Sequence, residues 1–228
     1  MKILIDDADI EAIKALYPVY PIDGVTTNPS ILAKSGRQPY DVLKEIRAFI
    51  GEEAELHVQV VGRTADAMLA DALRIHKELG ANTYTKIPTN PAGLEAMKRL
   101  RKAQPYAHIT ATAIYTPMQA FLAAKAGADY AAPYINRIDN LGADGIQTAK
   151  IIQDMFTNNG LKCEILAASF KNSQQVQALA QYGVGAATIA PAVIEGLVKN
   201  AAVAAAIDDF TRDFEGLCGK GITMKDAN

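Results

Sequence analysis

Short apolar runs alternate with amphipathic segments along almost the whole chain. The stretch Thr64–Leu79 shows the helical period well, because Ala67, Met68, Ala72 and Ile75 recur at spacings of three and four residues while charged residues occupy other sides of the helical wheel. Segments of this kind are predicted to be helices at Ile10–Leu16, Pro39–Ile50, Thr64–Leu79, Asn90–Ala103, Thr116–Ala126, Ile146–Asn158, Asn172–Tyr182 and Pro191–Val198.

The apolar runs between these segments are short and bounded by turn residues, which is typical of buried strands. Four of the predicted helices end at a glycine just before the next apolar run: Gly80, Gly127, Gly160 and Gly183. Strands are predicted at Lys2–Asp6, Gly24–Thr27, Glu55–Val61, Tyr84–Ile87, His108–Thr112, Tyr130–Pro133, Glu164–Ala168 and Ala186–Ile189.

This alternation predicts an α/β fold in which right-handed crossovers join parallel strands. Eight strand–helix units in 228 residues fit a compact (β/α)8 barrel, the TIM barrel. A doubly wound open sheet is the alternative, but no G-x-G-x-x-G follows the first predicted strand and no G-x-x-x-x-G-K-[ST] occurs in the sequence. We therefore predict one barrel domain over residues 1–228, with a C-terminal helix and tail at 201–228.

The predicted C-terminal helix, Ala201–Phe214, follows the eighth strand–helix unit and is rich in alanine. Its apolar residues Ile207, Phe210 and Phe214 lie on one face, which must be buried either on the barrel or on a neighbouring subunit. The last segment, Gly219–Asn228, is expected to be frayed or to depend on a partner.

Composition and charge exclude several classes of protein. Half of the residues are hydrophobic and 21% are charged, so the chain can form a sizeable core. A net charge of −2 offers no general positive field for nucleic acid or an anionic membrane. No apolar run approaches the roughly 18 residues of a membrane span, and the start turns acidic at Asp6, unlike a signal peptide.

The cysteines and histidines also limit the chemistry. Cys163 and Cys218 form no C-x-x-C pair, which indicates a reducing compartment rather than a disulfide framework or a zinc site. The three histidines lack metal-ligand spacing, so we predict no metal. We expect a cytoplasmic protein without nucleic-acid or membrane partners.

Polar residues follow apolar ones at the ends of the predicted strands, where barrel enzymes carry their active sites. Gln59 stands out because a buried amide needs hydrogen-bond partners. Structural roles are the alternative for other positions: Asp6 suits the N-cap of the first helix and Tyr134 suits a boundary aromatic. The strand-end residues are Asp6, Thr26, Thr27, Asn28, Gln59, Lys86, Thr112, Tyr134, Ile135, Asn136, Arg137, Ser169, Phe170 and Lys171.

Lys86 is the most informative of these residues because it lies inside the predicted strand Tyr84–Ile87, and this strand ends directly before Pro88. If its side chain points into the barrel, burial lowers its pKa, and a neutral amine can form a Schiff base with a carbonyl. The alternative is an outward-facing lysine whose stem lies between helices. The polar residues at the other strand ends favour the first interpretation.

Arg137, Ser169 and Lys171 follow the sixth and seventh predicted strands. Loops at this part of a barrel often form phosphate sites. A guanidinium, a hydroxyl and an ammonium group together suit a phosphoryl group. An ordinary surface salt-bridge cluster is the alternative.

Four motifs, in order along most of the chain, resemble those of the transaldolase family, in particular its short subfamily that contains fructose-6-phosphate aldolase. They are GVTTNPS at Gly24–Ser30, YTKIPTN at Tyr84–Asn90, APYINRID at Ala132–Asp139 and AASFKN at Ala167–Asn172. The resemblance implies a class I, Schiff-base enzyme with a (β/α)8 barrel that requires no metal or other cofactor. It further implies a small phosphorylated sugar as substrate and a ring-like homo-oligomer, such as a decamer.

The same resemblance implies a role for each polar strand-end residue. Lys86 is implied as the Schiff-base lysine. Asp6, Thr26 and Asn28 are implied to hold the hydroxyls of a dihydroxyacetone unit, Gln59, Thr112 and Tyr134 to hold a proton-shuttling water, and Arg137, Ser169 and Lys171 to bind phosphate.

Two positions divide the family by activity. Transaldolases are expected to carry Glu on the third strand and Phe on the sixth, whereas the aldolases carry Gln and Tyr, as Gln59 and Tyr134 do here. We therefore predict a lyase of carbohydrate metabolism that cleaves fructose 6-phosphate to dihydroxyacetone and glyceraldehyde 3-phosphate. The alternative is a pentose phosphate transaldolase that converts sedoheptulose 7-phosphate and glyceraldehyde 3-phosphate to erythrose 4-phosphate and fructose 6-phosphate. A non-catalytic phosphosugar-binding barrel and a deoxyribose-phosphate type of aldolase are more distant alternatives.

Overall fold

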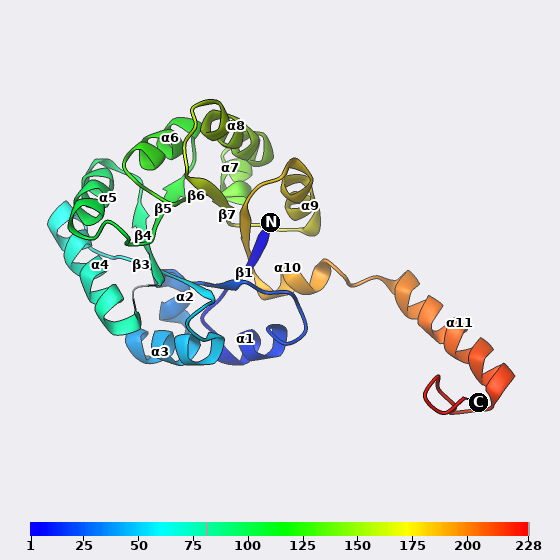
Figure 1. Cartoon of the computed structure of the whole chain (residues 1–228). Helices are drawn as coiled ribbons and strands as arrows, with labels where there is room; N and C mark the ends of the chain where they lie inside the picture. The colour runs from blue at the N-terminus through cyan, green and yellow to red at the C-terminus, as the bar shows by residue number, and fades with distance from the viewer. Residues whose placement is uncertain (81, 228) are drawn as a thin grey trace. The chain divides into compact units, whose positions relative to one another are not determined.

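The computed structural model describes residues 1–80 and 82–227 and contains a closed barrel of eight parallel strands in sequential order (Figure 1). The last strand pairs with the first, so the predicted (β/α)8 barrel is confirmed and the open sheet is wrong. Asn228, the last residue of the predicted tail, lies outside the described residues. The strands are β1 (Lys2–Asp6), β2 (Gly24–Thr26), β3 (Glu55–Gln59), β4 (Thr83–Pro88), β5 (Ile109–Ile114), β6 (Tyr130–Pro133), β7 (Glu164–Ala167) and β8 (Ala186–Ile189).

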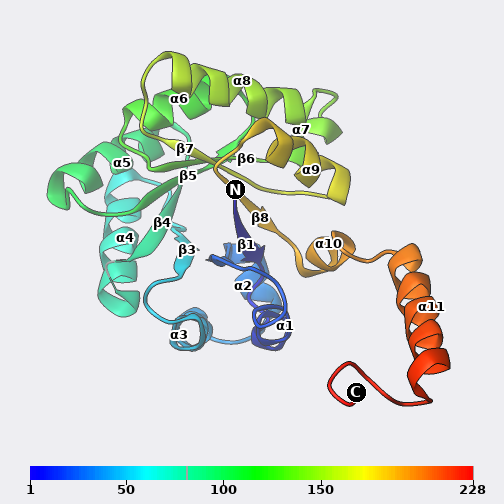
Figure 2. The same ribbon diagram turned by 45° about the vertical axis from the view of Figure 1, so that its right-hand side comes forward.

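The longer helices between consecutive strands lie outside the ring of strands (Figures 1 and 2). Several predicted helices begin one residue late, because the predicted first residue is an N-cap whose side chain accepts a backbone N–H; Thr64 and Asn90 are examples. The helices are α1 (Ile10–Leu16), α2 (Pro29–Lys34), α3 (Pro39–Ile50), α4 (Ala65–Leu79), α5 (Pro91–Ala103), α6 (Pro117–Lys125), α7 (Ile135–Asn140), α8 (Gly145–Asn158), α9 (Ser173–Tyr182), α10 (Pro191–Gly196) and α11 (Ala201–Cys218).

The structure corrects the sequence prediction in a few elements. The short helices α2 and α7 were not predicted, although both begin inside two of the four motifs, GVTTNPS and APYINRID, shortly after a strand. Strand β3 ends at Gln59 rather than Val61, because Asp71 Oδ2 accepts the N–H groups of Val61 and Gly62 and turns the chain away. Strand β5 continues to Ile114, and α11 continues to Cys218. Strands β1, β6 and β8 have the predicted bounds, β2, β4 and β7 differ from them by one residue at one end or at both, and α10 ends two residues early, at Gly196.

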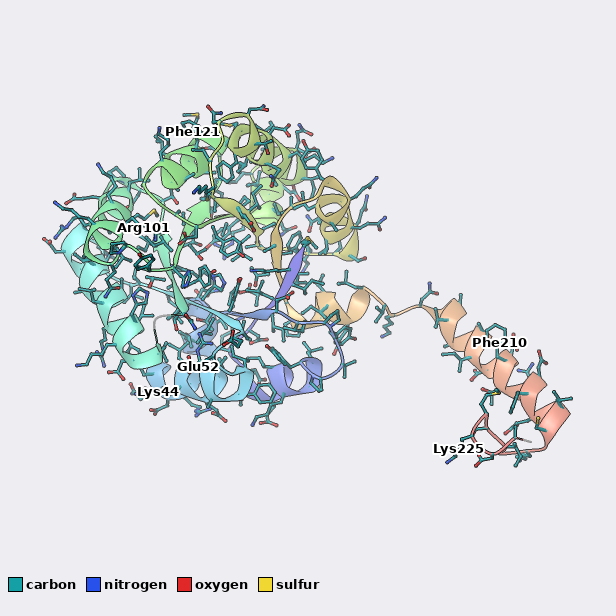
Figure 3. All side chains as sticks on the ribbon, in the orientation of Figure 1. Lys44, Glu52, Arg101, Phe121, Phe210 and Lys225 are labelled. Carbon is teal, nitrogen blue, oxygen red and sulfur yellow. The ribbon has the colours of Figure 1, made fainter. Side chains whose placement is uncertain are left out.

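The ring of strands encloses an empty space when the ribbon alone is drawn (Figure 1), but side chains fill this interior (Figure 3). Every second residue of each strand points inward, since side chains alternate along a strand. Part of the interior is an apolar cluster of Leu4, Tyr130, Ala132, Leu166 and Ala186. Tyr130 also joins this cluster to the polar side chains at the strand starts, since its hydroxyl bonds to Glu55.

The strand-start end of the interior holds a buried hydrogen-bond network around His57. Its Nε2 lies 3.1 Å from Glu55 Oε2 and its Nδ1 lies 2.9 Å from Thr110 Oγ1. The Tyr84 ring stacks on the imidazole at 4.4 Å between centroids, and Tyr130 Oη donates to Glu55 Oε1 at 3.2 Å. His57 lies in the middle of β3, and both of its ring nitrogens have hydrogen-bond partners. Its role is therefore structural.

The chain divides into two compact units, Met1–Ile194 and a C-terminal unit that begins at Glu195. Within the C-terminal unit, α11 has no buried side chain, and Ile207 and Phe210 are exposed. No helix in the described ranges is both long and apolar enough to cross a membrane.

Candidate active site

A cavity of about 350 Å³ opens at the carboxyl ends of the barrel strands. It is the place where barrels carry their chemistry. Among the predicted site residues, those that line it are Asp6, Asn28, Gln59, Lys86, Tyr134, Arg137 and Ser169. Pro29, Ser30, Ala168 and Thr188 complete the lining.

Lys86 supplies the amine of this cavity from the middle of β4. Its side chain is inside the barrel, 5% exposed, and its Nζ donates a hydrogen bond of 2.7 Å to the carbonyl oxygen of Thr27. Burial lowers the pKa of Lys86, and the negative charge of Asp6 opposes that change in part. The inward orientation excludes the alternative of a lysine between the outer helices.

Asp6 ends β1 and faces the same cavity. Thr26 Oγ1 donates to Asp6 Oδ1 at 2.9 Å and lies 2.5 Å from Thr188 Oγ1, so a row of hydroxyls holds the carboxyl in place. Burial raises the pKa of Asp6, while the charge of Lys86 lowers it. The N-cap alternative for Asp6 is wrong, because Asp9 caps α1.

Gln59 ends β3 and Tyr134 follows β6, and both line the cavity, with Thr112 of β5 buried behind Tyr134. Thr112 Oγ1 lies 2.8 Å from Tyr134 Oη, so the hydroxyl of a buried threonine fixes the phenol. Gln59 pairs in register with Lys86 across β3 and β4. Its Oε1 is buried and has no hydrogen-bond partner among the described residues, which leaves an acceptor for a bound molecule.

The remaining lining residues come from loops and short helices. Asn28 Oδ1 caps α2 by accepting the N–H of Ile31 at 3.0 Å. The side-chain NH2 group of Asn28 is therefore the part that can donate to a bound molecule. Ser169 adopts a left-handed conformation, with φ of +62°, which residues with a Cβ rarely do. Arg137 extends from α7 with its Cζ 4.7 Å from the Tyr134 ring centroid. The cavity thus joins an amine, a carboxyl and a phenol to one guanidinium.

Comparison with known proteins identifies the family. The sequence model described as transaldolase/fructose-6-phosphate aldolase matches residues 3–227. The chain belongs to this family. A probable fructose-6-phosphate aldolase of Streptococcus pneumoniae is 38% identical over 215 residues, which cover 94% of this chain and 96% of that protein. A probable transaldolase of Geotalea daltonii is 39% identical over 215 residues, 94% of this chain and 98% of that protein.

A third relative, a probable transaldolase of Thermodesulfovibrio yellowstonii, is 36% identical over 217 residues, covering 95% of this chain and 99% of that protein. The family resemblance stated from the four motifs is therefore confirmed. The protein is an enzyme of the fructose-6-phosphate aldolase or transaldolase kind, and the names of the relatives cover both activities.

Three predicted site residues of this family member do not line the cavity. Thr26 and Thr112 are fully buried behind it and reach it through Asp6 and Tyr134. Lys171 is exposed, and its backbone N–H donates to Gln175 Oε1 in the first turn of α9.

Sequence reasoning missed two residues that shape the site. Thr27 acts through its backbone carbonyl, which no side-chain pattern reveals. Thr188 lies in β8, whose end contributed no residue to the predicted site. It could have been found because residues two apart in a strand face the same side, and Ala186 faces inward. Among the residues the structure describes, no group of three or more His, Cys, Asp or Glu side chains is arranged to bind a metal.

Proposed function

We propose that the protein is a class I aldolase that cleaves fructose 6-phosphate through a Schiff base on Lys86. The observation that carries the proposal is the buried amine of Lys86 in a cavity that it shares with Asp6 and Tyr134. A buried lysine is less costly to keep neutral than an exposed one, and the neutral amine is the nucleophile.

The proposed reaction begins when Lys86 Nζ adds to the C2 carbonyl and water leaves, giving an iminium. A base removes the proton of the C4 hydroxyl, the C3–C4 bond breaks, and its electron pair moves to the iminium to form an enamine. Glyceraldehyde 3-phosphate departs. The enamine is then protonated at C3, and water hydrolyses the resulting iminium to dihydroxyacetone and the free lysine.

Tyr134 is the proposed proton acceptor at C4, acting through a water. The unpartnered Oε1 of Gln59 and the hydroxyl of Thr112 support this assignment, because each offers a polar group near the phenol. Asp6 has a raised pKa, so it is suited to give a proton to the C2 hydroxyl of the carbinolamine as that hydroxyl leaves as water, and to hold a hydroxyl of the substrate. Thr26 and Asn28 complete the proposed dihydroxyacetone end.

Arg137 and Ser169 are proposed to bind the phosphate of the sugar, with Lys171 as an outer contact. Arg137 and Ser169 line the cavity at the side of α7 and β7. A guanidinium is a strong partner for phosphate because it donates two parallel hydrogen bonds. The proposal makes the substrate a phosphorylated ketose.

Transaldolase activity is the second candidate, because relatives of closely similar identity are named probable transaldolase. Product analysis with fructose 6-phosphate alone separates the two activities. An aldolase releases free dihydroxyacetone, whereas a transaldolase turns over only when an acceptor such as erythrose 4-phosphate is present. Gln59 and Tyr134 favour release of dihydroxyacetone.

Borohydride reduction tests the Schiff base directly. We expect the wild type with fructose 6-phosphate to gain one reduced three-carbon adduct per chain by mass spectrometry, and peptide mapping to find it on Lys86. Lys86→Met is expected to form none and to lose cleavage. Lys98→Met, which removes an exposed lysine of α5, is the matched control and is expected to behave as the wild type. Full activity of Lys86→Met would overturn the proposal.

We also propose a cytoplasmic, ring-like homo-oligomer, such as a decamer, in which α11 contributes to the subunit contact. The apolar residues of α11 recur at spacings of four and three, as in helices that pack against helices: Val203, Ile207, Phe210, Phe214 and Leu217. Of these, Phe210 is 71% and Leu217 82% exposed. Light scattering tests this proposal, and a mass near 24.4 kDa would contradict it.

A further inference from the structure

Strand β5 carries one more residue than its neighbour. Thr112 and Ala113 of β5 lie opposite the single residue Ala132 of β6, which makes a β-bulge. Ala113 has a φ of +56°, in the left-handed region that residues with a Cβ rarely adopt. Such strain persists only where the surrounding structure holds it, and it often marks a functional position.

The bulge reverses the alternation of side chains along β5. Thr110 and Thr112 point into the barrel, so a regular strand would continue with Ile114 inward and Tyr115 outward. Instead, the Tyr115 ring meets the Tyr134 ring edge to face, with 5.6 Å between centroids, and Ile114 is fully buried away from the cavity lining. The bulge therefore places an aromatic rather than an aliphatic side chain behind Tyr134, which lines the cavity.

Tyr115 and Arg137 pack on the same side chain, since the guanidinium carbon of Arg137 lies 4.7 Å from the Tyr134 ring centroid and the Tyr115 ring meets that ring at its edge. The polar interaction of the Tyr115 hydroxyl with the guanidinium is the main reason that the pKa of Arg137 is raised. Two tyrosines thus hold a long side chain that is otherwise exposed.

We propose that Tyr115, turned towards Tyr134 and Arg137 by the bulge at Ala113, is a positioning residue that orients Arg137 for the anionic end of the substrate. A flexible arginine loses rotamer freedom when a ligand fixes it, so holding it in advance strengthens binding. The inference rests on one part of the proposed function, which is that Arg137 binds the phosphate of the substrate. It predicts discrimination between phosphorylated and unphosphorylated aldehydes.

Tyr115→Phe tests this role because it keeps the ring and removes the hydroxyl. In the condensation direction, with dihydroxyacetone as donor, we expect the KM for glyceraldehyde 3-phosphate to rise roughly 5- to 10-fold, since a polar interaction with a charged group is lost. The KM for unphosphorylated glyceraldehyde and both kcat values are expected to stay within about twofold. Tyr106→Phe, at a tyrosine that is 92% exposed, is the matched control.

A double-mutant cycle with Arg137→Ala separates a role through Arg137 from a direct one. We expect Tyr115→Phe to have no further effect once Arg137 is removed. Additive effects, or equal KM changes for both aldehydes, would overturn the proposal. Borohydride trapping on Lys86 is measured in parallel; a wild type without an adduct would refute the Schiff base, whereas an intact adduct with unchanged KM values would refute only the role of Tyr115.

Variants at Ala113 test the bulge itself. Ala113→Gly is expected to keep the wild-type KM values, because glycine adopts a positive φ freely. Ala113→Val is expected to raise the KM for glyceraldehyde 3-phosphate selectively, because a β-branched residue disfavours the left-handed conformation. Identical KM values in the Gly and Val variants would show that the bulge does not position Tyr115.

Discussion

His57 makes the fold sensitive to mild acid, because it is buried as an uncharged imidazole. Burial lowers the pKa of His57 from 6.5 to about 4, although the hydrogen bond to Glu55 opposes the change. Between these two pH values the unfolded chain takes up a proton that the folded chain does not. Acidification therefore favours the unfolded state, and stability falls as the pH drops from 6.5 towards 4.

The magnitude follows from the difference between the two pKa values. Each pH unit is equivalent to about 1.4 kcal/mol, so the full effect is about 3 kcal/mol, and most of it is reached at about pH 4.5. That is a large part of the 5–15 kcal/mol that typically holds a domain together. The pKa of Glu55 is lowered to about 2 from 4.5, so loss of its contribution belongs to a more acidic range.

His57→Gln removes the titrating group while leaving a side chain that can hydrogen-bond to Glu55. Urea unfolding at about pH 7.5 and about pH 4.5 measures the change in free energy of unfolding for both proteins. We expect the wild type to lose about 2–3 kcal/mol more than the variant over this interval. The measurement at the higher pH is the internal control, since it records the packing cost of the substitution alone. Equal losses in the two proteins would refute the reasoning.

Variants of the cavity and of α11 test the remaining steps. Tyr134→Phe loses the phenol that Thr112 holds, so cleavage of fructose 6-phosphate is expected to fall roughly 10²–10⁴-fold in a steady-state assay while the borohydride adduct still forms. Asp6→Asn removes the charge that raises the pKa of Lys86, so the acidic limb of the kcat/KM profile is expected to move to lower pH; an unmoved limb would contradict it. Phe210→Asp is expected to give a smaller assembly by light scattering, and an unchanged mass would exclude this face from the contact.

Most of the fold could be predicted from the sequence because helix and strand periods differ clearly in it. The amphipathic period defined helices such as α4, and glycines with positive φ, such as Gly80 and Gly183, end them as predicted. The short helices α2 and α7 escaped prediction because six residues hold fewer than two helical turns, too few for a period to be visible. Both begin beside the cavity and supply Ser30 and Arg137 to it.

The candidate site was predictable only where a side chain continues the alternation of a regular strand. Lys86 and Gln59 satisfy that condition, and both line the cavity as the strand-end rule predicts. Tyr115 does not satisfy it: by alternation it would face outward, and only the extra residue at Ala113 turns it inward. A bulge that uses alanine rather than glycine leaves no mark in the sequence.

The barrel interior holds the network of His57 next to the candidate reactive amine. Thr110, which bonds to His57, pairs in register with Lys86 across β4 and β5. The two groups are also coupled by charge, since a positive Lys86 further lowers the pKa of His57. Protonation of His57 while Lys86 is charged would place two buried cations in one barrel. In the proposed reaction, a neutral His57 lets Lys86 change its protonation and bonding without a second buried positive charge nearby.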